Sequence, residues 1–371
     1  MALFGNSTSF GAPQQTLGNT AAAAPSGDVE VSQPPPDGIS ALAFSSAADF
    51  LAASSWDNAV RVYGVEPNGS TAPKAMYQHE APVLDVVWSK DGSKIISAGA
   101  DKAARLYDVQ SGQAQQVAAH DAPIKSVRWV DQGAGILATG SWDKTVKYWD
   151  MRQPNPVSTA QLAERCYTMD CVWPYLVVGT AERKIQIFDL QQNPGVPIIT
   201  MDSPLKYQTR VISLFQRQPE PGQPTPPPGF AIGSVEGRVA IQYIRDENKN
   251  LNFSFKCHRK DPPAASREPQ QLFCVNDISF HPVQGTFSTV GSDGSINFWD
   301  KDSKTRLKTF DSKGSPIAAS AFNRTGSIFA YAVSYDWHKG HSFAPPSGSN
   351  TNKIFLHSCT DEEVKRRPKK I

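Results

Sequence analysis

The side chains whose types and spacing could support chemistry are a histidine, two hydroxyls, a carboxylate and an indole between residues 120 and 150. Hydrogen bonds could link them in the order His120, then Thr139 or Ser141, then Asp143, then Trp149. Such a chain satisfies buried polar groups and ties a turn to the strand that follows it. Neither a nucleophile elbow, nor a glycine-rich phosphate loop, nor an HExxH helix accompanies them in the sequence. We therefore predict a structural role for these residues and a protein that is not an enzyme.

Five cysteines are the other reactive side chains. They are odd in number, lack C-x-x-C spacing and have no histidine cluster beside them. This pattern predicts free thiols in a reducing compartment and neither a metal site nor a cofactor: Cys166, Cys171, Cys257, Cys274 and Cys359.

The stretch SWDKTVKYWD (141–150) reads as a polar turn followed by a strand with period-two patterning. Six copies begin at an acidic turn residue, and a degenerate seventh runs through 354–356: Asp57, Asp101, Asp143, Glu182, Glu236 and Asp293. The first spacings of 44, 42 and 39 residues fit the ~40–45 residues of a WD-type propeller blade. The later spacings of 54 and 57 residues indicate insertions in the later blades.

A second repeat lies upstream of each turn and reads as an innermost strand. Its seven copies are GISALAFS, APVLDVVWS, APIKSVRWV, CYTMDCVWP, TRVISLFQR, CVNDISFHP and PIAASAFNR. We therefore predict an all-β, seven-bladed WD-repeat β-propeller. A propeller must close its ring without an open sheet edge, and we expect the segment 29–31 to do so beside 354–356.

Length and composition divide the chain into three parts. Residues 1–27 are rich in Ala, Ser, Gln and Gly, and contain two Phe-Gly pairs, at 4–5 and 10–11. We expect this leader to be disordered, with the pairs either contacting transport machinery or arising by chance. The propeller should span 28–360, and 361–371 should form a basic tail. The net charge is +2, so nucleic-acid attraction requires a local basic patch.

Two insertions stand out inside the predicted propeller. Residues 216–229 (QRQPEPGQPTPPPG) are too rich in proline for anything but an extended, exposed loop, whose function the sequence leaves open. Residues 245–271 contain one further strand, at 252–257, and the segment KCHRK. No apolar run approaches the length of a membrane helix and no signal peptide precedes the repeats, so we expect no membrane association.

Over about residues 30–370, the chain resembles the messenger-RNA export propellers of the nuclear pore. The resemblance rests on SPLKYQTRVISLF (203–215), SVEGRVAIQYI (234–244), FSFKCHR (253–259), VNDISFHPVQGTFSTVGSDGSINFWDKDSKTRLK (275–308) and FNRTGSIFAYAVSYDWHKGH (322–341). It implies an export factor in the nucleus and at the nuclear pore complex that shuttles to the cytoplasm. It also implies a monomeric propeller that binds the GLEBS segment of an FG nucleoporin one to one and associates with messenger RNA or ribonucleoprotein.

The resemblance also implies which residues meet the acidic GLEBS segment across the top of the propeller. Arg238 and Arg306, with Lys304 beside the latter, match the basic positions; Phe255 and Trp299 match an apolar pocket near them. From the residues alone, Trp299 is equally the structural tryptophan of its repeat, and Arg238 is equally a solvated turn cation.

RNA could contact two basic segments through its phosphates. Alternatively, the first segment is a solvated loop and the second is a solubilising or nuclear-import tail. The residues are Lys256, His258, Arg259 and Lys260 in the first segment, and Lys365, Arg366, Arg367, Lys369 and Lys370 in the second. The resemblance extends to the related spindle-checkpoint propeller, which shares the KCHR and GSDG segments and binds GLEBS-type motifs of checkpoint kinases. A checkpoint adaptor, including possible mitotic partners, is therefore the alternative function; a generic scaffold is a third.

Overall fold

The computed structural model describes residues 27–66, 69–131, 135–215, 228–263, 268–346 and 351–367. The two Phe-Gly pairs, residues 216–227 of the proline-rich insertion, and Lys369 and Lys370 lie outside these residues.

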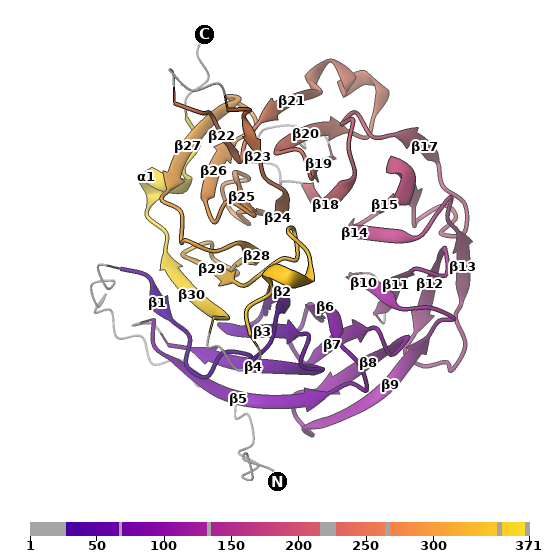
Figure 1. Cartoon of the computed structure of the whole chain (residues 1–371). Helices are drawn as coiled ribbons and strands as arrows, with labels where there is room; N and C mark the ends of the chain where they lie inside the picture. Colours follow the sequence, from indigo (N-terminus) through magenta and orange to yellow (C-terminus); the bar gives the residue numbers. More distant parts are fainter. Residues whose placement is uncertain are drawn as a thin grey trace.

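Seven four-stranded antiparallel sheets stand around a central axis, as the prediction of a seven-bladed propeller requires (Figure 1). The first three blades, numbered along the chain, are β2–β5 (Ile39–Phe44, Phe50–Ser55, Ala59–Val65, Thr71–Gln78), β6–β9 (Val83–Trp88, Lys94–Gly99, Ala103–Asp108, Gln113–Ala119) and β10–β13 (Ile124–Val130, Ile136–Ser141, Thr145–Asp150, Ser158–Gln161). Blades four and five are β14–β17 (Cys166–Val172, Tyr175–Thr180, Lys184–Asp189, Ile199–Asp202) and β18–β21 (Thr209–Phe215, Gly229–Ser234, Arg238–Tyr243, Phe253–Lys256). Blade six is β24–β27 (Val275–Phe280, Phe287–Gly291, Ile296–Asp300, Thr305–Phe310).

The seventh blade confirms the predicted closure of the ring. Its strands are β28 (Ile317–Phe322), β29 (Ile328–Val333) and β30 (Lys353–Ser358), and its outer strand is β1 (Val29–Glu30) from the other end of the chain. Val29 pairs with Leu356 in this ladder, and Val31 is buried with 1% exposure. The sheet edge of the last blade is thereby covered by the start of the chain.

Burial is greatest in the middle strands of the blades, and this distribution explains the strand sequences. Second strands such as β3 and β7 are buried on both faces, so they read as nearly continuous runs of small and apolar residues. Outer strands such as β9 and β27 expose many of their residues and carry Gln, Lys and Arg. The strand expected at 252–257 is β21, the outer strand of blade five.

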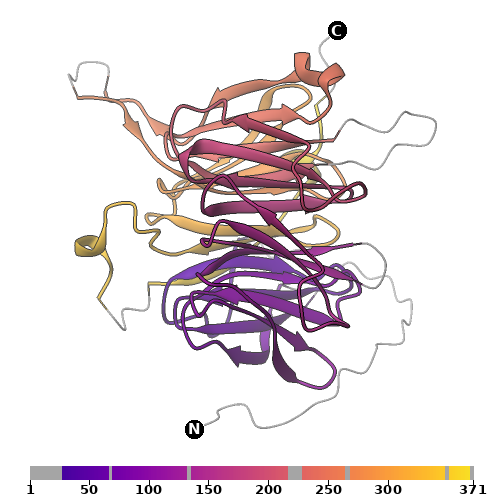
Figure 2. The same ribbon diagram turned by 90° about the vertical axis from the view of Figure 1, so that its right-hand side faces the viewer.

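Turns and short elements lie at the two ends of the blades. We call the end at which the first strand of each blade begins the upper face; the turns at Asp57, Asp143 and Asp293 lie there because neighbouring strands are antiparallel. The remaining elements are η1 (Ala181–Arg183), η2 (Asp246–Leu251), the strand pair β22 (Arg259–Lys260) and β23 (Gln271–Leu272), η3 (His341–Phe343) and α1 (Asp361–Val364). In the side view of Figure 2, the segment that carries η3 projects from one face of the disc.

The beginning of the predicted basic tail packs onto the propeller. A capping box formed by Thr360 and Glu363 starts α1, and Val364 is buried against blades six and seven. Its carbonyl oxygen accepts a 2.7 Å hydrogen bond from Thr286 Oγ1. Residues 361–367 are therefore anchored, whatever the following residues do. Of the helices in the described part of the chain, none is long and apolar enough to cross a membrane.

Candidate functional site

The predicted hydrogen-bonded chain of blade three is confirmed and runs through Thr139. His120 Nδ1 lies 2.7 Å from Asp143 Oδ2, and His120 Nε2 lies 2.7 Å from Thr139 Oγ1. Trp149 Nε1 donates to the same Thr139 oxygen at 2.8 Å. Burial lowers the pKa of His120 more than the carboxylate of Asp143 raises it, so the imidazole is neutral and the group is a structural brace.

Blade six contains a second chain of this kind that the sequence interpretation missed. His258 Nδ1 lies 2.8 Å from Asp293 Oδ1, His258 Nε2 lies 2.9 Å from Thr289 Oγ1, and Trp299 Nε1 donates to Thr289 at 3.0 Å. Burial raises the pKa of Asp293, but the hydrogen bond and charge of His258 outweigh it, and the pKa lies below its usual value. His258 is only 4% exposed. Its assignment to an RNA-binding segment was wrong, because the basic neighbours of this histidine hid its place in the repeat.

Four of the five residues assigned to the GLEBS site come together where blade five meets blade six. The rings of Phe255 and Trp299 lie 4.5 Å apart, and the guanidinium of Arg306 lies over Trp299 at 5.9 Å. Lys304 lies 4.9 Å above the ring of Phe253, a residue that the sequence interpretation did not assign to the GLEBS site. We call this group the aromatic seam: Phe253, Phe255, Trp299, Lys304 and Arg306.

No carboxylate of the described residues neutralises the cations of the aromatic seam. Among the residues that the structure describes, neither Lys304 nor Arg306 has a carboxylate within ion-pair distance, and both side chains are exposed. The three rings are only half-buried. Unpaired cations above partly exposed rings favour a ligand that carries carboxylates next to apolar side chains.

Arg238 lies apart from this seam. It opens β20 at the upper face and pairs with Lys256 across the ladder, whereas Val239 pairs with Phe255. Because side chains alternate along a strand, Arg238 and Lys256 are on the face towards blade four and Phe255 is on the face towards blade six. Arg306 sits near the lower end of its blade, since β27 begins there.

The turn before Arg238 is tightly specified. Gly237 has φ +63°, and a Cβ atom there would lie 2.7 Å from the carbonyl oxygen of His258, so only glycine fits. The carboxylate of Glu236 lies 3.6 Å from Arg238 Nε and 3.9 Å from Arg259. Arg238 is thus held at the upper face with its charge partly matched.

The predicted RNA contacts divide into engaged and free cations. Arg259 donates to the carbonyl oxygens of Glu236 and Gly237, at 2.9 and 3.2 Å. Arg366 Nε donates to the carbonyl oxygen of Gln284 at 2.6 Å, and its guanidinium lies 3.4 Å from Asp302. These two arginines brace the fold.

Four cations of the two segments have exposed side chains: Lys256, Lys260, Lys365 and Arg367. The first two belong to the upper part of blade five, whereas residues 365–367 follow α1 and lie beside the lower turn of blade six, where Arg367 N donates to Asp300. The structure therefore does not bring residues 365–367 close to the first basic segment.

The described residues contain no candidate metal site. Across the described ranges, no group of three or more His, Cys, Asp or Glu side chains is placed to hold a metal ion, and the five cysteines are free thiols. Burial raises the pKa of Cys166 and Cys171 to about 12, so both are protonated at neutral pH.

Comparison with known proteins bears on both the fold and the family. The family model described as "WD domain, G-beta repeat" matches residues 31–64, 72–108, 112–150 and 268–300. The chain is 50% identical over 345 residues to the Poly(A)+ RNA export protein of Schizosaccharomyces pombe, covering 92% of this chain and 94% of that protein.

Two further relatives carry a similar name. The mRNA export factor GLE2 of Chaetomium thermophilum is 49% identical over 374 residues, covering 99% of this chain and 98% of the relative. The mRNA export factor of Danio rerio is 47% identical over 391 residues, covering 100% of both. The similarity thus extends well beyond the repeat positions that all WD propellers share.

Proposed function

This chain belongs to the family of WD-repeat mRNA export factors, and from that premise we propose that it links messenger ribonucleoprotein to the nuclear pore by binding the acidic GLEBS segment of an FG nucleoporin. The role in mRNA export follows from the family. The docking site, the nuclear-pore localisation and the partner are our proposal, and they rest on the geometry of the site.

The observation that carries the proposal is the aromatic seam. Its two unpaired cations lie at 4.9 and 5.9 Å from the rings of Phe253 and Trp299, which creates adjacent apolar and cationic surfaces. A segment with carboxylates beside apolar anchors gains burial of the rings and charge-assisted hydrogen bonds together. Arg306 can engage a carboxylate with two donors in parallel.

The path of the segment differs from the one that the resemblance implies. Arg238 is at the upper end of blade five and Arg306 is near the lower end of blade six. A segment that meets both must cross the upper face of blade five and descend along the aromatic seam. Each strand advances ~3.3 Å per residue, so only a few extended residues are needed for the descent.

Calorimetric titration with a synthetic GLEBS segment tests this proposal. Wild-type protein should bind it one to one, and the double variant Lys304→Glu with Arg306→Glu should lose binding by at least about thirtyfold, since removing one partner of a charge pair at an interface costs ~2–5 kcal/mol. Equal affinity for the double variant would refute the site. Tighter binding of a checkpoint-kinase segment than of the nucleoporin segment would favour the checkpoint function instead.

A further inference from the structure

The upper mouth of the central channel is built from one irregularity that recurs in all seven blades. In every first strand the ladder skips a single residue near the upper end, as between Ile124 and Ser126 of β10. Such a bulge re-aims its side chain, and all seven skipped residues line the channel: Ser40, Leu84, Lys125, Tyr167, Arg210, Asn276 and Ala318.

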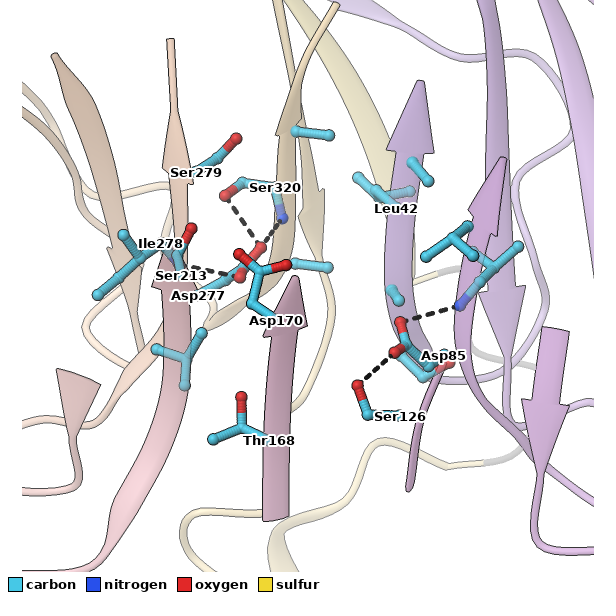
Figure 3. A pocket seen from close by; sticks show the side chains of 18 of the residues that line it. Leu42, Asp85, Ser126, Thr168, Asp170, Ser213, Asp277, Ile278, Ser279 and Ser320 are labelled. Carbon is cyan, nitrogen blue, oxygen red and sulfur yellow. Dashed lines mark hydrogen bonds between the residues drawn. The ribbon is translucent and has the colours of Figure 1, made fainter. Parts of the chain in front are cut away.

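Below this mouth, the carboxylates that line the channel are occupied by protein donors. Asp85 accepts hydrogen bonds from Ser126 Oγ at 2.8 Å and from the Arg128 guanidinium at 2.7 Å. Asp170 accepts from Arg128 Nε at 2.9 Å and from the backbone of the next blade at 2.7 Å. Asp277 accepts from both the backbone and the hydroxyl of Ser320 (Figure 3).

One side of the mouth has the opposite imbalance, because three hydrogen-bond donors there lack strong acceptors. In the described part of the chain, Lys125 Nζ and the Tyr167 hydroxyl make no hydrogen bond or ion pair, and Arg210 makes only a 3.5 Å contact with the carbonyl oxygen of Asp336. The three residues belong to the consecutive blades three, four and five, so they form one arc of the mouth.

Charge reinforces this imbalance. Lys125 is half-buried. Burial lowers the pKa of its ammonium; the carboxylate of Asp85 opposes this shift, and the neighbouring cations Arg210 and Arg128 act in the same direction as burial. Asp336, at the edge of the mouth, is already bonded to Asn276 at 2.6 Å and to His338 at 2.6 Å. The arc therefore presents two cations and a hydroxyl, and the carboxylate that acts on Lys125, Asp85, is already bonded to Ser126 and Arg128.

We propose that this arc is a binding site for the phosphate group of a small molecule, held by Lys125, Tyr167 and Arg210. A phosphate group carries several acceptor oxygens and few protons to donate. It therefore complements a set of hydrogen-bond donors that lack acceptors. This site is separate from the aromatic seam and does not depend on the docking function proposed above.

The channel below the mouth favours a small compound over a polymer. Its volume is about 420 Å³, within the range of small-molecule pockets. Hydroxyl groups line its walls (Figure 3), which suits a polar body attached to the phosphate group: Ser126, Thr168, Ser213, Ser279 and Ser320. A nucleic-acid backbone would have to leave the upper face and turn into the channel to reach the half-buried ammonium of Lys125.

Calorimetry in a phosphate-free buffer of low ionic strength tests the site with two probes, inorganic phosphate and glucose 6-phosphate. We expect saturable one-to-one binding with a Kd below about 1 mM. Tyr167→Phe, which removes one hydroxyl group, should weaken binding severalfold. Lys125→Met with Arg210→Met should weaken it at least about tenfold, the value of one charge-assisted hydrogen bond. Lys90→Met, an exposed lysine paired with Asp131 at the lower face, is the matched control and should bind like wild type.

The two probes distinguish the source of the phosphate group. Equal affinities identify free phosphate as the ligand, and tighter binding of glucose 6-phosphate identifies an ester whose body enters the channel. The proposal is overturned if wild type shows no saturable binding of either probe, or if the double variant binds both as well as the Lys90 control does. Binding of an RNA oligonucleotide, but of neither probe, through Lys125 and Arg210 would also overturn it.

Discussion

Replacing Asp28 by asparagine should weaken the closure of the propeller ring in a pH-dependent way. This carboxylate accepts hydrogen bonds from His357 Nδ1 at 2.7 Å, from Lys313 Nζ at 2.8 Å and from the Tyr331 hydroxyl. Its side chain is 19% exposed. It therefore joins the start of the chain to two residues of blade seven, Tyr331 and His357, and to Lys313, which precedes that blade.

The pKa shifts in this cluster determine the sign of the pH dependence. Burial raises the pKa of Asp28, but the hydrogen bonds from His357 and Lys313 outweigh it and hold the pKa far below its usual range. Burial lowers the pKa of His357, but hydrogen bonds to Asp28 and Glu363 outweigh it, and the net shift is upward. The contribution of Asp28 is complete above an unfolded pKa of ~3.9 and is lost as the pH falls through its folded value. The contribution of His357 is complete below ~6.5 and is lost as the pH rises through its folded value.

These contributions overlap most at mildly acidic pH. Asp28→Asn keeps the shape of the side chain but removes the charge, so we expect a loss of ~2–3 kcal/mol in the free energy of unfolding at about pH 6, as for a hydrogen bond between charged groups. At a pH above the raised pKa of His357, where the imidazole has lost its proton, the loss should fall to ~1–2 kcal/mol because Lys313 remains.

Urea denaturation of wild type and variants at these two pH values measures the difference. Glu30→Gln is the matched control, because Glu30 lies two residues further along the chain, on β1, and pairs with Lys353 at 3.0 Å in a more exposed position. Its loss should be at most ~0.5–1 kcal/mol at both pH values. The reasoning is refuted if Asp28→Asn costs the same at both pH values, or if Glu30→Gln costs as much.

Two other predictions separate bracing residues from binding residues. His258→Ala should cost ~2–4 kcal/mol of stability in thermal or urea unfolding, because Thr289 and Asp293 lose their partner. The control Lys260→Ala should change the stability by no more than ~0.5 kcal/mol. Loss of RNA affinity in His258→Ala at unchanged stability would contradict the bracing role of His258. In filter binding of single-stranded RNA, Lys256→Gln with Lys260→Gln should reduce the slope of log affinity against log salt by ~1.4, at ~0.7 per phosphate contact. Arg366→Gln should leave that slope unchanged, because its guanidinium is bonded within the protein. If Arg366→Gln reduced the slope as much as the double lysine variant does, the assignment of engaged and free cations would be wrong.

The repeats made the architecture predictable from the sequence. Acidic turns at regular spacing and seven apolar strand segments predict seven blades. The closure of the ring was predictable because the short segment 29–31 has no other sheet to join. The brace through His120 was predictable too, because its partners recur at repeat positions. The same brace through His258 was hidden, since the histidine lies in a basic segment and its blade follows an insertion.

The arrangement of the candidate site depends on registers that the sequence does not reveal. Arg238 and Phe255 fall on opposite faces of blade five because Arg238 pairs with Lys256. In blade six, a bulge lets Trp299 pair with Arg306 and Phe298 with Lys308, so two cations of one strand face different neighbours. The arc of Lys125, Tyr167 and Arg210 likewise depends on one skipped residue in each first strand.

This bulge supplies the most direct test of the central claim. Arg306 and Lys308 are both exposed cations of β27, but only Arg306 lies over Trp299; Lys308 lies 5.8 Å from the ring of Phe310, towards blade seven. The measurement is the affinity of the GLEBS segment for Arg306→Glu and for Lys308→Glu, two variants with the same change of charge on the same strand. Docking along the aromatic seam predicts a loss of at least about thirtyfold for Arg306→Glu and less than about threefold for Lys308→Glu. Equal losses would show that binding depends on the net charge of the protein and not on the position of Arg306. A greater loss for Lys308→Glu would place the partner on the other side of blade six. Either result would contradict docking along the aromatic seam.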